Sequence, residues 1–79
     1  MLSCKIISGQ GTEEYGNIEK AMLPGLSGQI QILPGHAETF LLFTKGDITL
    51  IQKGSMHSKV VSVDGGACHV LGDVISIVL

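Results

Sequence analysis

A cysteine followed directly by a histidine, Cys68-His69, is the pair in this chain that comes nearest to a nucleophile beside its base. A catalytic thiol needs an imidazole within hydrogen-bond reach. Both residues lie in a short segment that predicts a strand, and neighbouring side chains on a strand point to opposite faces. We therefore expect Cys68 to be a buried thiol and His69 an exposed imidazole, and not a catalytic pair.

The three histidines, His36, His57 and His69, do not have the spacing of a metal site. The chain contains no C-x-x-C and no H-x-x-x-H, which are the patterns that place zinc ligands on one short element. We predict no metal site and no cofactor.

The acidic residues do not form a paired acid and base. Asp64 and Asp73 flank turns, where short carboxylates cap backbone N–H groups. Glu13-Glu14 is predicted to lie in a solvated loop. A phosphate-binding loop is also not expected, because no glycine is followed by the helix that such a loop requires. The sequence therefore predicts no catalytic site.

Composition restricts the class of protein. The 79 residues suffice for one small domain, and 44% are hydrophobic, with two Phe, one Tyr and no Trp. The net charge is −2, and the five basic residues are scattered lysines, which does not favour nucleic acid as a partner. No apolar run approaches the roughly 20 residues of a membrane span, so we expect a soluble domain that is not exported, with no small-molecule substrate. In that setting Cys4 and Cys68 should be reduced, buried thiols, although a disulfide between an early and a late strand is conceivable.

Glycines recur every six to ten residues along much of the chain, a spacing typical of small all-β domains. No segment has the length or period of a helix. The apolar segments between the turn signals predict eight strands, at residues 2–8, 17–23, 29–33, 39–43, 47–52, 57–63, 68–71 and 74–79.

Some of these strands are apolar on both faces. Leu41-Leu42-Phe43, Val60-Val61 and the run 74–79 lack a clear polar alternation. Either they are central strands, or a second protein covers their outer face. Alternatively, neighbouring Ser and Thr residues keep that face wet, and the sequence leaves these alternatives open.

Two Pro-Gly pairs, Pro24-Gly25 and Pro34-Gly35, enclose one alternating segment. Proline presets φ and the following glycine accepts a positive φ, so both pairs predict tight turns. Gly65-Gly66 is a third predicted turn, because Asp64-Gly65 is also a hairpin signal.

These motifs resemble a known family. The segments Met22-Leu23-Pro24-Gly25, Gly28 and Ile32-Leu33-Pro34-Gly35-His36-Ala37 match in order and spacing the N-terminal domain of the epsilon subunit of F-type ATP synthases, called delta in mitochondria. Lys45-Gly46-Asp47-Ile48, Val63-Asp64-Gly65-Gly66 and the closing run 74–79 extend the resemblance over nearly the whole chain. Glu38, Asp64 and Gln29 depart from the usual pattern, which has Pro, Ser and often Glu at these positions.

The resemblance implies a fold and a role. The fold would be a small flattened antiparallel β-sandwich of about eight to ten short strands, with residues 1–79 as one domain. The role would be that of a non-catalytic central-stalk subunit that bridges the gamma subunit and the c ring, coupling proton transport to ATP synthesis. Such a subunit is peripheral to the membrane, on the cytoplasmic face of a bacterial inner membrane or the matrix side in mitochondria. The family usually continues with two C-terminal helices, which residues 1–79 do not include.

The resemblance also assigns surfaces. Ser8, Gly28 and Gln29 would face the c ring, and His36 and Ala37 would face gamma. From the residues alone, His36 reads as a turn residue whose ring hydrogen-bonds the local backbone.

A carrier domain of the biotinyl or lipoyl type is the alternative function, since it is also a flattened all-β structure. Such domains carry a modified lysine at a hairpin tip, and Lys45 before Gly46 is the nearest candidate.

Overall fold

The computed structural model describes residues 1–54 and 58–79, and within these residues it contains six β-strands and no helix. The predicted all-β class is confirmed. The strands are β1 (Leu2–Ser8), β2 (Gly11–Gly25), β3 (Gly28–Ile32), β4 (Thr39–Gln52), β5 (Ser58–Leu71) and β6 (Val74–Val78).

The prediction of eight to ten short strands was wrong, because two pairs of predicted strands are each one long strand. Segments 39–43 and 47–52 join to form β4, and segments 57–63 and 68–71 both belong to β5. The described part of β5 begins at Ser58, and His57 lies outside the described residues. The two long strands pair from Thr39 opposite Val70 to Ile51 opposite Ser58. Glycines inside these two long strands allow them to bend, so each strand can curve around the core.

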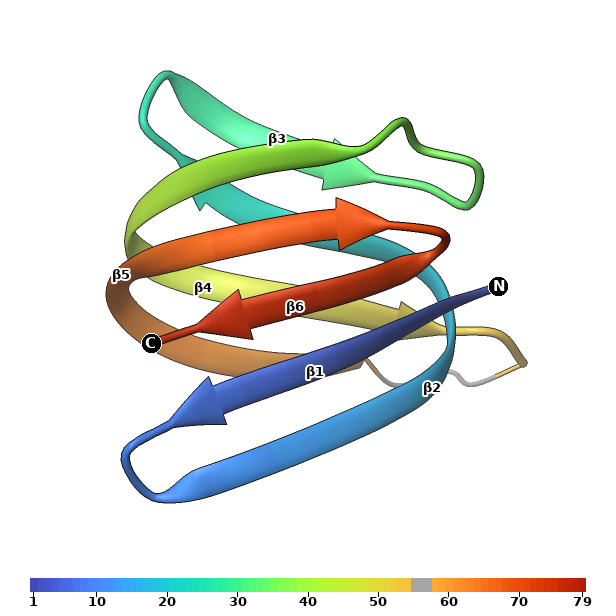
Figure 1. Cartoon of the computed structure of the whole chain (residues 1–79), viewed down its shortest axis with the longest axis horizontal. Coiled ribbons are helices and arrows are strands. Elements are labelled where there is room, and N and C mark those ends of the chain that lie inside the picture. Colours follow the sequence, from blue (N-terminus) through green and yellow to red (C-terminus); the bar gives the residue numbers. More distant parts are fainter. Residues whose placement is uncertain (55–57) are drawn as a thin grey trace.

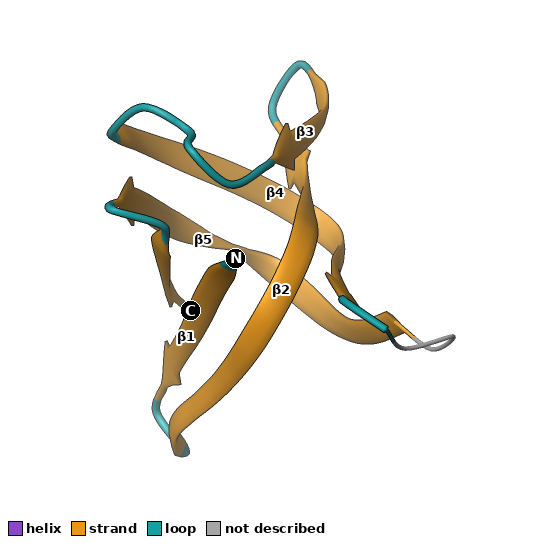
Figure 2. Ribbon diagram, turned by 90° about the vertical axis from the view of Figure 1, so that its right-hand side faces the viewer, coloured by secondary structure: helices purple, strands orange, loops and turns teal. Residues whose placement is uncertain are grey.

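The strands follow the order β1-β6-β5-β4-β2-β3, and β1 also pairs with β2, so five strands close into a ring. Figure 2 shows the long strand β2 curving from one side of the molecule to the other, and Figure 1 shows β1 and β6 side by side. Strand β3 pairs with the second half of β2 and lies outside the ring.

One strand pair departs from the predicted antiparallel arrangement. Strands β1 and β6 are parallel, with Cys4 opposite Ile75 and Ile6 opposite Ile77. The other four strand pairs in the ring are antiparallel. A ring with an odd number of strands cannot alternate direction throughout, so closing five strands requires one parallel pair.

The core lies inside the flattened ring and is made of aliphatic side chains, one phenylalanine and two thiols. Alternate residues of each strand point inward, as the period of two requires. Cys4 and Cys68 are both buried and free, which confirms the prediction for these residues. The buried residues are Leu2, Cys4, Ile6, Ile18, Ala21, Leu23, Ile32, Phe43, Ile48, Leu50, Val63, Cys68, Val70, Ile75 and Ile77.

The Pro34-Gly35 turn is confirmed. The amide of His36 donates to the carbonyl of Leu33 at 3.2 Å, and Gly35 has φ of 83°. Positive φ at the third position is the mark of a type II turn, for which proline at the second position is favoured.

The prediction of a tight turn at Pro24-Gly25 was wrong. Both residues belong to the end of β2, and the chain reverses at Leu26-Ser27 instead. Gly25 is required by packing, because a Cβ there would lie 2.7 Å from the carbonyl oxygen of Gly28.

The predicted turn at Gly65-Gly66 was also wrong, because both glycines lie inside β5. Gly65 has φ of 117°, a value that L residues rarely adopt. A Cβ on Gly66 would lie 2.5 Å from the carbonyl oxygen of Val78 and 2.8 Å from Cζ of Phe43. The two glycines therefore allow the neighbouring strands β4 and β6 to approach β5 closely.

Candidate functional site

The sequence-predicted contact residues lie toward opposite ends of the molecule. Ser8 ends β1, and Gly28 and Gln29 begin β3. The turns after β1 and before β3 both lie at the left end of the long axis in Figure 1, on opposite sides of it. His36 and Ala37 lie in the connection between β3 and β4, at the right end. The structure thus separates the two predicted sets.

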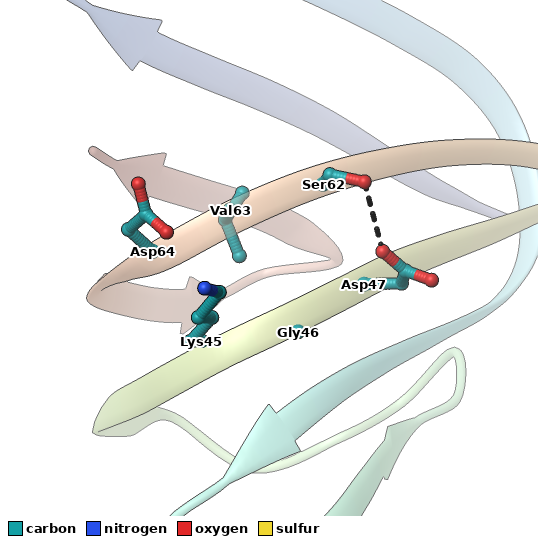
Figure 3. Close-up of a pocket in the computed structure, with 6 residues that line it drawn as sticks. All are labelled: Lys45, Gly46, Asp47, Ser62, Val63 and Asp64. Carbon is teal, nitrogen blue, oxygen red and sulfur yellow. Dashed lines mark hydrogen bonds between the residues drawn. The ribbon is translucent and has the colours of Figure 1, made fainter.

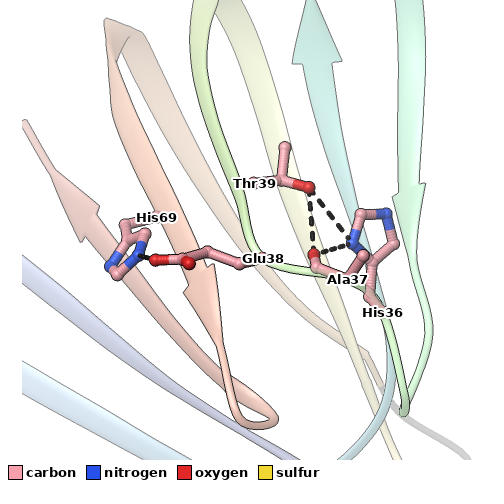
Figure 4. A network of polar contacts seen from close by, with 5 residues as sticks. All are labelled: His36, Ala37, Glu38, Thr39 and His69. Atoms are coloured by element: carbon pink, nitrogen blue, oxygen red, sulfur yellow. Dashed lines mark hydrogen bonds and ion pairs between the residues drawn. The ribbon is translucent and has the colours of Figure 1, made fainter.

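The His36 ring is held by its own loop (Figure 4). Its Nδ1 lies 2.8 Å from the carbonyl oxygen of Ala37, so Nδ1 carries the proton and donates. The hydroxyl of Thr39 donates to the same carbonyl at 3.0 Å. The interpretation of His36 as a turn residue bonded to the local backbone is confirmed, and its contact with a partner stays a prediction.

This loop is also tied to the next turn along the surface. The amide of Gly35 donates to Oδ1 of Asp73 at 2.8 Å. Asp73 follows Gly72 in the turn between β5 and β6 and has φ of 62°, a conformation that Asp tolerates. The expectation that Asp73 caps a backbone N–H group is confirmed, and the bond joins two loops that are 38 residues apart.

Cys68 and His69 point to opposite faces of β5, as predicted. Burial raises the pKa of Cys68 to about 11 and that of Cys4 to about 12, so neither is a thiolate at neutral pH. The imidazole of His69 faces outward, and its Nε2 lies 2.9 Å from Oε2 of Glu38. The Phe40 ring stacks on it, with the centroids 4.1 Å apart and the planes 13° from parallel.

Glu38 and Phe40 were missed by the sequence reasoning. Phe40 lies in β4, and Glu38 lies in the loop just before it. Their meeting with His69 depends on the register that sets Phe40 opposite His69.

These residues border an exposed apolar surface formed by β4, β5 and β6. Cross-strand rows place Leu42 opposite Ala67 and Ala67 opposite Val78. Phe40 is 75% exposed and Leu42 is 63% exposed, and between them lies a shallow hollow with a volume of about 310 Å³. Ser76 and His69 lie opposite each other on the same outward side of β6 and β5, so the Ser and Thr alternative holds for this row, while the rows on either side of it are apolar. We call this surface of β4, β5 and β6 the apolar face, and its side chains are Phe40, Leu42, Ala67, Leu71, Val74 and Val78.

A polar hollow lies between the paired strands β4 and β5, at residues 45–47 and 62–64 (Figure 3). It has a volume of about 260 Å³ and is lined by Lys45, Asp47, Ser62 and Asp64, among others. Ser62 donates to Oδ1 of Asp47 at 3.0 Å. Lys45 lies inside β4, with Asp64 opposite it in β5. The carrier-domain alternative required Lys45 at a hairpin tip, and the structure contradicts that placement.

Neither a metal centre nor a membrane helix is found in the described part of the chain. Within residues 1–54 and 58–79, no three His, Cys, Asp or Glu side chains gather where they could hold a metal ion. The same residues contain no helix long and apolar enough to cross a membrane.

Comparison with known proteins agrees with the fold and the motifs. The family model of the ATP synthase delta/epsilon chain β-sandwich domain matches residues 1–79. The chain belongs to this family.

Relatives and solved structures extend the finding. The ATP synthase epsilon chain of Wolinella succinogenes is 31% identical over 70 residues, which are 89% of this chain and 53% of that protein. That of Campylobacter jejuni subsp. jejuni is 26% identical over 77 residues, or 98% of this chain and 59% of that protein. This delta/epsilon-type chain thus spans about half the length of the curated relatives it matches.

The solved structures establish the shared fold. A chain in the central stalk and c ring of the Tetrahymena thermophila mitochondrial ATP synthase superimposes with a TM-score of 0.82 at 8% identity, over 98% of this chain and 61% of that one. A chain of the Euglena gracilis mitochondrial ATP synthase gives 0.82 at 18% identity, over 95% and 48%.

Proposed function

We propose that this protein is a non-catalytic central-stalk subunit of a rotary F-type ATP synthase. It would bridge the gamma subunit and the c ring, so that proton-driven rotation of the ring turns gamma and drives ATP synthesis. The complex would hold it at the membrane as a peripheral subunit, on the cytoplasmic face in a bacterium or the matrix side in a mitochondrion. Family membership supports this role, because the relatives are ATP synthase epsilon chains.

The apolar face is the observation that carries the proposal. A domain of 79 residues that leaves Phe40 75% exposed and Leu42 63% exposed beside a hollow presents a contiguous surface of the kind that protein partners cover. We assign this face to gamma. His36 and Ala37 precede its first strand, β4, so the resemblance and the exposed apolar side chains point to the same region.

The opposite end is assigned to the c ring. Ser8 and the pair Gly28-Gln29 flank the two turns at that end. Leu26, at the tip of the turn before β3, is 72% exposed and would join them. The amide of Gln29 carries no charge, so its contact with the ring would rest on hydrogen bonds.

A stiff body suits a subunit that transmits torque between two such contacts. The bond from Gly35 to Asp73 and the type II turn at Pro34 fix the end nearest gamma. Closure of five strands into one ring leaves few independent ways for the two ends to move relative to each other.

The test is co-expression with the host's gamma subunit, followed by size-exclusion chromatography and mass measurement. The wild-type chain should give a 1:1 complex. Leu42→Asp should abolish it, because the complex would bury an unpaired carboxylate at a cost of about 3 kcal/mol, more than a hundredfold in affinity. The isolated variant should fold normally, since residue 42 is exposed in the free domain.

Val60→Asp is the matched control. Val60 is 51% exposed, but it lies in the part of β5 opposite Thr49, away from the apolar face. It should leave the complex intact. A stable complex with Leu42→Asp, or equal loss with both variants, would contradict the assignment of the apolar face to gamma.

The contact with the c ring needs the assembled complex. A photo-crosslinking residue at position 29 should give a product with the c subunit, and the same residue at the exposed position 19 on β2 should not. Equal products from both positions would refute the assignment of this end.

A further inference from the structure

Glu38, Phe40 and His69 form a cluster at the border of the apolar face that the proposed role does not explain. Phe40 comes from β4, His69 from β5 and Glu38 from the loop before β4, and His69 contacts both of the others. We call them the Glu38 cluster. A carboxylate beside an exposed aromatic ring, at the edge of an apolar surface, is a combination that attracts one particular kind of side chain.

The carboxylate of Glu38 has unused capacity. His69 holds Oε2 at 2.9 Å, and the side chain of Glu38 remains 52% exposed. An ionised carboxylate accepts up to about four hydrogen bonds. No Lys or Arg side chain pairs with it among the described residues, where the imidazole of His69 is the one basic group in contact with it. Oε1 is therefore open to a donor from outside the domain.

The Phe40 ring offers the second element. One face of the ring lies against the imidazole of His69, yet 75% of the residue is exposed. Cations are attracted to the face of an aromatic ring within about 6 Å of its centroid. The hollow between Phe40 and Leu42 lies on the same surface and could take the aliphatic part of a long side chain.

The cluster is held in place before any partner arrives. His69 fixes one oxygen of Glu38 and supports the Phe40 ring, and the preceding loop is anchored by the bond from Gly35 to Asp73. Groups held in this way lose little conformational entropy on binding.

We propose that the Glu38 cluster is a receptor for one arginine side chain of the partner that covers the apolar face. A guanidinium has both the planar surface that stacks on a ring such as Phe40 and the N–H donors that a carboxylate such as Glu38 accepts, whereas a lysine ammonium lacks the planar surface. The charge of Glu38 would select the orientation of the partner on a face that is otherwise apolar. This inference rests on the proposed function, since it names a feature of the surface that gamma presents.

Lys5, a cation on the same side of the sheet, does not neutralise Glu38. Lys5 in β1 belongs to the same cross-strand row through Ser76, but it lies opposite Glu14 of β2. Its charge has an acidic neighbour on its own domain, whereas Glu38 has only the imidazole.

The test measures the affinity of the purified chain for the host's gamma subunit by titration calorimetry. Glu38→Gln keeps the size of the side chain and removes its charge, and it should weaken binding about tenfold. Phe40→Leu keeps an apolar side chain without the ring and should weaken binding severalfold. Glu19→Gln, a charge removal on β2 outside the cluster, is the control and should have no effect. Raising the salt concentration should weaken the wild type more than Glu38→Gln.

A second measurement separates this proposal from the proposed function. Ring proton resonances of Phe40 and His69 are followed by NMR during titration of the isolated chain with N-acetyl-arginine amide or N-acetyl-lysine amide. The arginine probe should shift them more than the lysine probe, and Glu38→Gln should remove the difference. If gamma binds the wild type and Leu42→Asp abolishes binding, but Glu38→Gln binds equally well, the receptor is refuted and the stalk role stands. If gamma does not bind the wild type, the stalk role fails. Equal shifts with both probes refute the receptor independently.

Discussion

Adding one methyl group at Gly66 should destabilise this domain far more than adding one at Gly16. Both glycines lie in strands, and neither has a positive φ. A Cβ at position 66 would lie 2.5 Å from the carbonyl oxygen of Val78 and 2.8 Å from Cζ of Phe43, whereas a Cβ at position 16 would meet no atom within 4 Å. The pair of variants therefore isolates the effect of close strand packing.

The expected magnitude follows from what must move. Ordinary contacts between heavy atoms are about 3.5 Å or longer, so β6 would have to retreat by about 1 Å at Val78. Overpacking costs about 1–3 kcal/mol, and a strained backbone hydrogen bond about 1 kcal/mol more. Reduced entropy of the unfolded chain returns about 0.4–1 kcal/mol. We expect Gly66→Ala to lower the free energy of unfolding by about 2 kcal/mol.

Urea unfolding followed by far-ultraviolet circular dichroism measures the difference. With a slope of about 1 kcal/mol per molar for a small domain, the midpoint should fall by about 2 M. Gly16→Ala should leave it unchanged or raise it slightly. A midpoint for Gly66→Ala within about 0.5 M of the wild type would show that β6 is not held against β5 as closely as the structure has it.

Three further predictions test the core and the loops. Ile75→Asp places a charge at a position with no exposed surface and should leave the chain unfolded by circular dichroism, so loss of gamma binding there reports folding alone. Asp73→Ala removes the acceptor for the Gly35 amide and should cost about 2 kcal/mol in thermal unfolding, while Asp73→Asn should cost less than about 0.5 kcal/mol; equal effects would refute the bond. Because burial raises the pKa of Cys4 to about 12 and of Cys68 to about 11, above their usual 9.0, the stability that these thiols contribute should be complete below pH 9.0 and lost as the pH rises toward those values. Unfolding measured from pH 8 to 11 should show this decline, and a flat profile would contradict the burial of both thiols.

The sequence by itself determined the local features of this protein. The glycine spacing and the short apolar segments predicted an all-β domain, and the motif from Met22 to Ala37 indicated the family. The turn at Pro34-Gly35 was predictable because both of its requirements, a fixed φ and a positive φ, lie in adjacent residues. The opposite faces of Cys68 and His69 followed from the period of a strand alone.

Only the tertiary structure decided which strands meet and what their outer faces carry. Gly65-Gly66 has the same local sequence whether it turns the chain or lets it pass close to Val78, so the outcome depends on the neighbouring strand β6 and not on the pair itself. The parallel pairing of β1 with β6 follows from closing an odd number of strands. The cluster of Glu38, Phe40 and His69 exists because the register of β4 on β5 brings together residues about 30 positions apart. Hydrogen-bonded register is a property of two segments at once, and the sequence of either segment alone does not contain it.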